Sequence, residues 1–147
     1  MTTKRRVLLR VMGACIGITL LYVGLTFGAS EFGGEVATLL RPEQDGSLKK
    51  VRVWIVDANN QSWVEHGDSN SFWITQLTDP SEISVIRGGE EKKYIGVSDV
   101  NAHELYHQLR REKYGIADRI VEITSFGSAS KDACAGVPVR LKQKERA

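Results

Sequence analysis

The feature that most constrains the fold is an uncharged apolar run from Val11 to Ala29, which reads VMGACIGITLLYVGLTFGA. As a helix, a run of this length spans about 30 Å, the thickness of the hydrocarbon core of a bilayer. A single chain segment can satisfy its backbone hydrogen bonds there only as a helix. We therefore expect a basic tail at residues 1–10, a transmembrane helix at 11–29, a spacer at 30–34 and a folded domain at 35–147.

The charges on either side of this run predict its orientation. Four cations precede it and two acids follow it: Lys4, Arg5, Arg6 and Arg10, then Glu31 and Glu35. Because cationic flanks stay in the cytoplasm, we expect a single-pass protein of the cytoplasmic (inner) membrane, with its N-terminus inside and its domain outside. A signal peptide cleaved near Ala29 is the alternative. The apolar run is longer than a usual signal-peptide core, which favours a retained anchor.

Glycines recur along one face of the expected membrane helix. They form two G-x-x-x-G pairs, Gly13 with Gly17 and Gly24 with Gly28. Such a face allows two helices to approach closely and would support a homodimer. Glycine is also common in membrane helices for other reasons, so both interpretations stay open.

Composition excludes some classes of protein. The formal net charge of the 147 residues is +2, which gives no strong attraction to nucleic acid. One of the two cysteines, Cys15, lies in the membrane segment, so Cys134 has no partner for a disulfide within the domain. We therefore expect a domain that its own hydrophobic core holds together.

The rest of the chain alternates strand-like runs with turns and short helical patterns. Residues 71–80, 101–113 and 117–123 read as helices, with Asn101 and Glu104 as a capping box and with Ile120 and Ile123 facing the core. The order is β-β-β-α-β-β-α-α-β. Six short antiparallel strands with helices between them predict a mainly β (α+β) domain built as a small closed barrel. The expected strands are 35–40, 51–58, 61–66, 82–87, 92–99 and 137–142.

His103, Glu104 and His107 spell the motif H-E-x-x-H. On a helix the two histidines could bind zinc, with the glutamate as general base, as in a zinc hydrolase. The chain offers only His66 or a distant carboxylate such as Glu122 as a third ligand, and Glu104 occupies a capping position. We therefore predict no metal site and keep the zinc hydrolase as a minor alternative.

Two further features suggest a ligand. Three cations, Lys49, Lys50 and Arg52, follow a glycine-serine turn, an arrangement that can bind phosphate through backbone N–H groups and charge. The aromatic pair Phe72-Trp73 stands in a polar stretch, where the core, a flat ligand or a partner must cover it. A solvated turn and simple core packing are the alternatives.

Several stretches taken together resemble the split-barrel deazaflavin-dependent nitroreductases. They are DGSLKKVRVWIVD, SWVEHGDSNSFWITQLTDP, ISVIRGGEEKKYIGV and VPVRL, within about Glu35 to Lys142. In that family a serine-glycine-basic turn precedes the second strand, a glycine loop leads to a Trp-Tyr-x-Asn-Leu helix ending in Asn-Pro, and a final strand contains Ile/Val-Pro-Val. Here Trp73, Gln76, Leu77, Asp79 and Pro80 fall on the helix signature.

The resemblance implies a six-stranded split barrel that holds a deazaflavin or FMN and passes hydride to a quinone or nitro compound. It assigns the phosphate side to Ser47, Lys49, Lys50 and Arg52, the cofactor loop to Gly67, Asp68, Ser69 and Asn70, and the ring contact to Trp73. It identifies no catalytic residue.

A membrane-anchored oxidoreductase is therefore the first hypothesis. The rival is a non-catalytic, membrane-anchored barrel that serves as a binding or assembly module. Asp45, Leu48 and Ile74 depart from the family pattern, and Asp45 and Ile74 favour the rival, whereas the three cations favour the enzyme.

Overall fold

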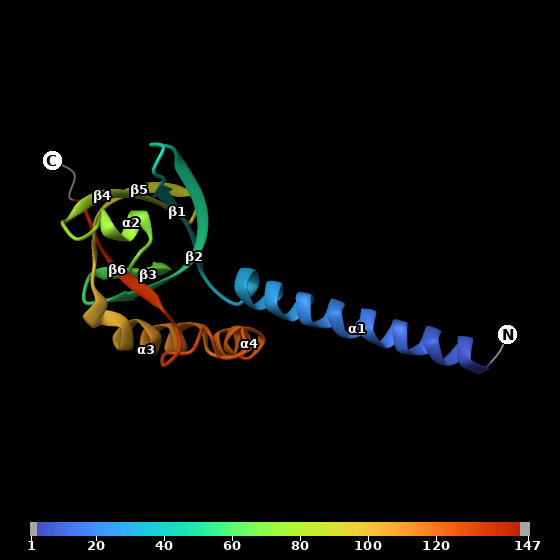
Figure 1. Cartoon of the computed structure of the whole chain (residues 1–147). Coiled ribbons are helices and arrows are strands. Elements are labelled where there is room, and N and C mark those ends of the chain that lie inside the picture. Colours follow the sequence, from blue (N-terminus) through green and yellow to red (C-terminus); the bar gives the residue numbers. More distant parts are fainter. Residues whose placement is uncertain (1–2, 145–147) are drawn as a thin grey trace.

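The computed structural model describes residues 3–144 and has one long helix attached to a barrel (Figure 1). In chain order the elements are α1 (Thr3–Phe32), β1 (Val36–Pro42), β2 (Leu48–Ala58), β3 (Gln61–Asp68), α2 (Phe72–Thr75), β4 (Ser81–Arg87), β5 (Glu90–Ser98), the 3₁₀ turn η1 (Val100–Ala102), α3 (His103–Tyr114), α4 (Ile116–Thr124) and β6 (Gly136–Gln143). The predicted order of strands and helices in the domain is confirmed.

The six strands close into an antiparallel barrel in the order β1-β2-β3-β6-β5-β4. Closure depends on β1, which pairs with β2 along its whole length and with β4 at Thr38 and Leu39. The β4–β5 hairpin turns at Gly88 and Gly89, as predicted, because both adopt positive φ angles that suit glycine. The mainly β, six-stranded antiparallel barrel expected from the sequence is confirmed.

Apolar side chains fill the inside of the barrel. Successive strand residues point to opposite faces, so alternate positions such as Val53 and Ile55 of β2 enter the core. The short helix α2 adds Trp73, which is only 1% exposed, and Leu77 follows it into the same core. The Trp73 indole N–H donates to the carbonyl of His66 at 2.8 Å, so the one polar group of this side chain is satisfied.

A second cluster lies outside the barrel, where α3 packs across β2 and β6. Its buried members are Val56, Trp63, Ala102, Tyr106 and Tyr114. The Tyr114 ring also stacks on Trp54, with centroids 4.3 Å apart and planes within 8°. One wall of the barrel therefore separates two cores, an inner one and an outer one under α3.

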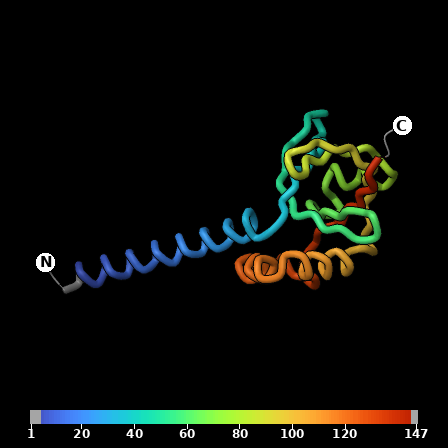
Figure 2. Tube along the Cα trace, turned by 180° about the vertical axis from the view of Figure 1, so that it is seen from behind, coloured from blue at the N-terminus to red at the C-terminus, as the bar shows by residue number. Residues whose placement is uncertain are grey.

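Helix α1 extends away from the barrel, and α4 lies beside its C-terminal part (Figure 2). The Tyr22 hydroxyl donates to the carbonyl of Thr124 at 2.5 Å, and the Tyr22 ring stacks on Phe126. From Arg5 to Phe32, α1 is long and apolar enough to cross a membrane, with a mean hydropathy of 2.0. This rests on length and composition, which a signal sequence also satisfies.

Two local predictions were wrong. The capping box does not form, because η1 precedes α3 and Asn101 lies within that turn, where its N–H donates to the Asp99 carboxylate at 3.2 Å. Ile123 does not face the core but is 74% exposed, because α4 turns Ala117 and Asp118 inward instead. The outward apolar side chains of α4 continue the apolar surface of α1.

Candidate functional site

The cationic turn expected to bind phosphate is already occupied by a carboxylate of the chain itself. The Ser47 N–H donates to Asp45 Oδ1 at 2.9 Å, and this contact lowers the pKa of Asp45. Lys49 and Lys50 are exposed at the start of β2. An anion approaching this turn would meet the negative charge of Asp45, at the position where the resemblance expects a basic residue.

The residues assigned to the two ends of one cofactor lie on opposite faces of the β2 wall. Val51 and Val53 point into the inner core, so Arg52 between them points outward, where its Nε donates to Glu31 Oε2 at 2.5 Å. Trp73 lies inside the barrel. A single flavin cannot contact both side chains in this arrangement.

The loop expected beside the cofactor closes on itself. Asp68 Oδ1 accepts from the Asn70 N–H at 3.0 Å and from the Ser71 hydroxyl at 3.1 Å. Gly67 has a φ of 92°, and a side chain there would meet the Ser71 hydroxyl. The nine residues therefore do not fit a deazaflavin or FMN as one site, and their role in cofactor binding stays a prediction.

A pocket of about 220 Å³ lies where α1 meets the outer face of the barrel. Its lining includes Ser30, Glu31, Arg52, Trp54, Tyr106 and Arg110. Of the nine residues predicted to bind a cofactor, Arg52 alone is among its lining residues. Pockets for drug-sized ligands measure about 300 Å³ or more, so this one suits a single flat ring better than a flavin.

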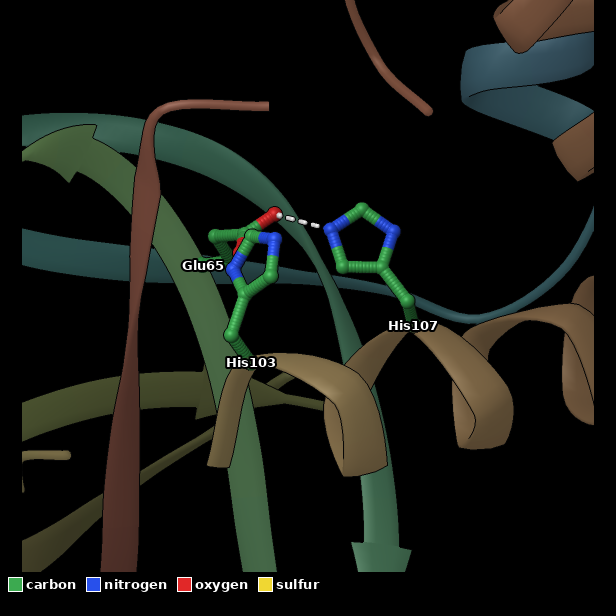
Figure 3. A group of neighbouring side chains, drawn as sticks. All are labelled: Glu65, His103 and His107. Carbon is green, nitrogen blue, oxygen red and sulfur yellow. Dashed lines mark ion pairs between the residues drawn. The ribbon is translucent and has the colours of Figure 1, made fainter. Parts of the chain in front are cut away.

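Glu65 of β3, which also lines this pocket, meets the two histidines of α3 (Figure 3). His103 Nδ1 is 3.3 Å from Glu65 Oε1, and His107 Nε2 is 3.6 Å from Glu65 Oε2. The histidines reach the same carboxylate because they are four residues apart and so lie on one helix face. We call these three residues the Glu65 cluster.

The carboxylate of Glu65 lies beside an irregularity in strand β3. The β3–β6 register shifts between Glu65 and Asp68, and such a bulge re-aims side chains near it. On β6, a side chain at Gly136 would come within 2.6 Å of the Glu65 side chain. The bulge and the glycine together leave room for Glu65 under α3.

Burial dominates the electrostatics of the Glu65 cluster. The side chains of Glu65 and His107 are only 6% and 5% exposed. Burial raises the pKa of Glu65, and burial together with the nearby Arg110 cation lowers the pKa of His107 to about 4. His107 is therefore neutral at pH 7 and keeps a lone pair on one ring nitrogen.

Neighbouring groups contact the Glu65 cluster without saturating it. The Cys134 thiol donates to Glu65 Oε2 at 3.4 Å, whereas the nearest Arg110 nitrogen, Nη1, is 3.8 Å away. Arg110 is directed elsewhere, because it donates to Asp118 and to the Ala129 carbonyl, each at 2.6 Å. Within residues 3–144, Glu65 Oε1 and His107 Nε2 are buried and have no hydrogen-bond partner.

Glu65 was not predicted from the sequence as a companion of the histidines. The residues predicted as a possible third ligand were His66, which instead lies 3.0 Å from Arg41 Nη1, and Glu122, which pairs with Arg111. Glu65 stands next to His66 in the chain but points to the other face of β3. A signal was present, since Glu65 is an acid two residues after Trp63 on a face that α3 covers.

The comparisons with known proteins add little to this site. No family profile matches the sequence, and no curated protein matches it. Among solved structures, the chain is similar to HutZ, described as the heme storage protein from Vibrio cholerae. The TM-score is 0.49 and the identity 12%, over 76% of this chain and 82% of HutZ, and at this level the likeness carries no argument about a ligand.

Proposed function

We propose that this chain is a membrane-anchored module that binds a small flat compound, such as a quinone or nitroaromatic ring, at the outer surface of the cytoplasmic membrane. The pocket between α1 and the barrel carries the proposal. Ser30 and Glu31, from the end of the membrane helix, form part of its wall, and Trp54 forms another part. A ring dissolved in the outer leaflet would reach this pocket without leaving the membrane surface.

The lining of the pocket suits such a ring. Trp54 and Tyr106 contribute aromatic side chains to the wall, and Arg52 offers a cationic donor to carbonyl or nitro oxygens. A few convergent polar groups in a mostly apolar pocket are what fixes a small ligand in position. The volume of about 220 Å³ limits the ligand to about one ring.

The membrane attachment is supported by α4 as well as by α1. Ile116, Ile123 and Phe126 are exposed large apolar side chains, and α4 runs beside the last turns of α1. If α1 spans the membrane, these side chains lie at the bilayer surface, where contact with lipid stabilises apolar groups. In the proposed arrangement α1 is retained, the basic N-terminus lies inside and the barrel lies outside.

A membrane-anchored oxidoreductase remains the second candidate. The closed six-stranded barrel agrees with the fold that the resemblance implies, and Lys49 and Lys50 are free of ion pairs among residues 3–144. A deazaflavin or FMN would supply the hydride in that case. Because the nine assigned residues do not form one pocket, we derive no step through such a cofactor.

The test uses the full chain in lipid nanodiscs, titrated by calorimetry with a short-chain benzoquinone and with a nitroaromatic. Val121 lines the pocket, so Val121→Phe should fill it and weaken ring binding about tenfold or more. Ile123→Phe, on the same helix but 74% exposed, is the matched control and should bind normally. Failure of the wild-type chain to bind either ring would overturn the proposal.

The same nanodisc preparation distinguishes the binding module from the second candidate, the oxidoreductase. Addition of FMN or a deazaflavin should leave the cofactor's fluorescence unchanged. Stoichiometric quenching that Lys49→Ala weakens would replace the binding module with the oxidoreductase. Reporters fused to the C-terminus test the topology, where activity of a cytoplasm-only reporter would contradict the proposed orientation.

A further inference from the structure

We propose that the Glu65 cluster, made by Glu65, His103 and His107, is a binding site for a first-row divalent metal ion such as Zn²⁺, held between β3 and α3. This inference does not depend on the ring-binding function. It replaces the expectation from the sequence that the two histidines hold no metal, which rested on the lack of a third ligand.

The spacing of the donor atoms fits a shared ion. Ligand atoms about 2.0 to 2.2 Å from a tetrahedral zinc ion are about 3.3 Å from one another. The His103–Glu65 and His107–Glu65 approaches are 3.3 Å and 3.6 Å, and one donor atom from each residue lies within 4.8 Å of the other two. Small side-chain adjustments would bring all three to bonding distance.

The donor atoms approach one another without hydrogen bonding. Glu65 Oε1 and His107 Nε2 are buried, and within residues 3–144 neither has a hydrogen-bond partner. Burying polar atoms in this state destabilises the fold. A cation between them would satisfy both lone pairs at once.

The ring of His103 is held in the tautomer that a metal requires. Its Nε2 lies 3.0 Å from the carbonyl of Lys131, and a carbonyl can only accept, so Nε2 carries the hydrogen. The lone pair is therefore on Nδ1, the atom that faces Glu65. Metal-binding histidines commonly have their second nitrogen fixed by a backbone carbonyl in this way.

The site differs from that of an H-E-x-x-H hydrolase. The side chain of Glu104 is 79% exposed and pairs with Lys131 at 3.0 Å, so it does not face the cluster as a general base would. The third ligand is Glu65, from a strand distant in the sequence. Two imidazole nitrogens and one carboxylate suit Zn²⁺ and similar ions, and they leave a coordination position open.

Cys134 is the side chain best placed to fill that position. Its thiol already contacts Glu65 Oε2 at 3.4 Å, and the Gly136 N–H donates to its sulfur at 3.3 Å. Cobalt(II) distinguishes a site with Cys134 bound from a site with three ligands, because a thiolate ligand gives an intense sulfur-to-cobalt charge-transfer band. Cys134→Ser should abolish that band if the sulfur binds.

The experiment uses the full chain in detergent, stripped with a chelator and then equilibrated with Zn²⁺ or Co²⁺. One ion per chain should bind, with a rise in the unfolding temperature. Glu65→Gln and His107→Ala should each weaken binding about 100-fold or more. His66→Ala removes the neighbouring imidazole and Glu104→Gln removes the motif carboxylate, and both should bind like the wild type.

Two outcomes would overturn the proposal. One is a wild-type chain that retains no stoichiometric ion and gives no tetrahedral Co²⁺ spectrum. The other is a loss of binding in Glu104→Gln with none in Glu65→Gln, which would assign the metal to a different arrangement. If His107→Ala does not fold, the metal affinity of the isosteric variant Glu65→Gln decides whether the proposal holds. Ring binding is measured separately on the same chain, so either proposal can fail alone.

Discussion

The two cores on either side of the β2–β3 wall are built from different chemistry. Inside the barrel the core is apolar, and the indole of Trp73 has its hydrogen bond to His66. Under α3 the burial includes charged and titratable groups, among them His107, Arg110 and Asp118. The three buried side-chain atoms without a hydrogen-bond partner among residues 3–144, from Trp63, Glu65 and His107, are all on the outer side.

This difference separates stability from function. A satisfied apolar core lowers the free energy of the fold and needs nothing more. A core with unsatisfied polar atoms and closely packed charges costs stability, so its retention suggests a ligand or ion that compensates for it. Substitutions in the inner core and in the outer core should therefore differ in how they affect the free energy of unfolding and the affinity for metal.

The largest effect is expected for Trp73→Ala, inside the barrel. Loss of this buried ring leaves a cavity, and the free energy of unfolding should fall by about 3 to 5 kcal/mol. Chemical denaturation of the full chain measures this. Metal affinity of the fraction that remains folded should not change, and a selective loss of metal binding would contradict the separation of the two cores.

The next effect is expected for Asp118→Asn, in the outer core. Asp118 is 1% exposed and accepts from Arg110 at 2.6 Å and Arg111 at 2.5 Å, so removal of its charge should cost roughly 2 to 3 kcal/mol. Glu122→Gln is the control on the same helix, since Glu122 pairs with Arg111 near the surface and should cost less than about 1 kcal/mol. Equal losses of unfolding free energy in the two variants would mean that burial does not make the Asp118 ion pairs stronger than the Glu122 ion pair.

Tyr114 connects the two regions and should give a smaller effect. Its hydroxyl lies 3.0 Å from the Ile55 N–H and 2.6 Å from the Glu35 carbonyl, and burial raises its pKa to about 12. Tyr114→Phe leaves these groups without their partner and should cost about 1 to 2 kcal/mol in denaturation. The Tyr94 hydroxyl, in the inner core, makes no hydrogen bond to another of the residues 3–144, so Tyr94→Phe should be nearly neutral.

The smallest effect belongs to an ion network at the edge of the barrel, outside both cores. Hydrogen bonds from Arg87 lower the pKa of Asp57 and of Glu35 below their ordinary values of 3.8 and 4.5. Their contribution is therefore present above about pH 5 and is lost as the pH falls below 4. Both carboxylates are more than a third exposed, so screening keeps it below about 1 kcal/mol.

Unfolding free energies at pH 7 and pH 3 measure this contribution. Arg87→Gln should reduce the difference between the two values, whereas Lys92→Gln, whose nearest acid is the exposed Glu90, should leave it unchanged. An unchanged pH dependence in Arg87→Gln would show that the network is only a surface feature.

The fold was predictable because its signals are local. Alternating apolar runs such as 51–58, a glycine turn at 88–89 and an uncharged run at 11–29 each specify one element. The Ile123 error arose because the helix pattern shows an apolar face but not what covers it. Here α4 turns that face outward beside α1.

The site was only partly predictable because it depends on contacts between distant segments. The two histidines were visible as a motif, but Glu65 comes from a strand whose register shifts beside it, and no spacing in the sequence encodes that. The cations after the glycine-serine turn were visible in the sequence itself, whereas the cofactor loop from Gly67 to Asn70 was assigned by resemblance. The alternation of β2 turns Arg52 to the outer face of the wall, whereas Trp73 of α2 lies inside the barrel.

The closure of the barrel has a consequence for the proposed membrane-anchored state. Anchored domains diffuse in two dimensions, at high local concentration and with similar orientations, conditions in which exposed strand edges would pair between neighbours. Because β1 pairs with both β2 and β4, no strand of this barrel presents a free edge for such pairing. In the proposed membrane-anchored state, crowding should therefore not bring these chains together through their sheets.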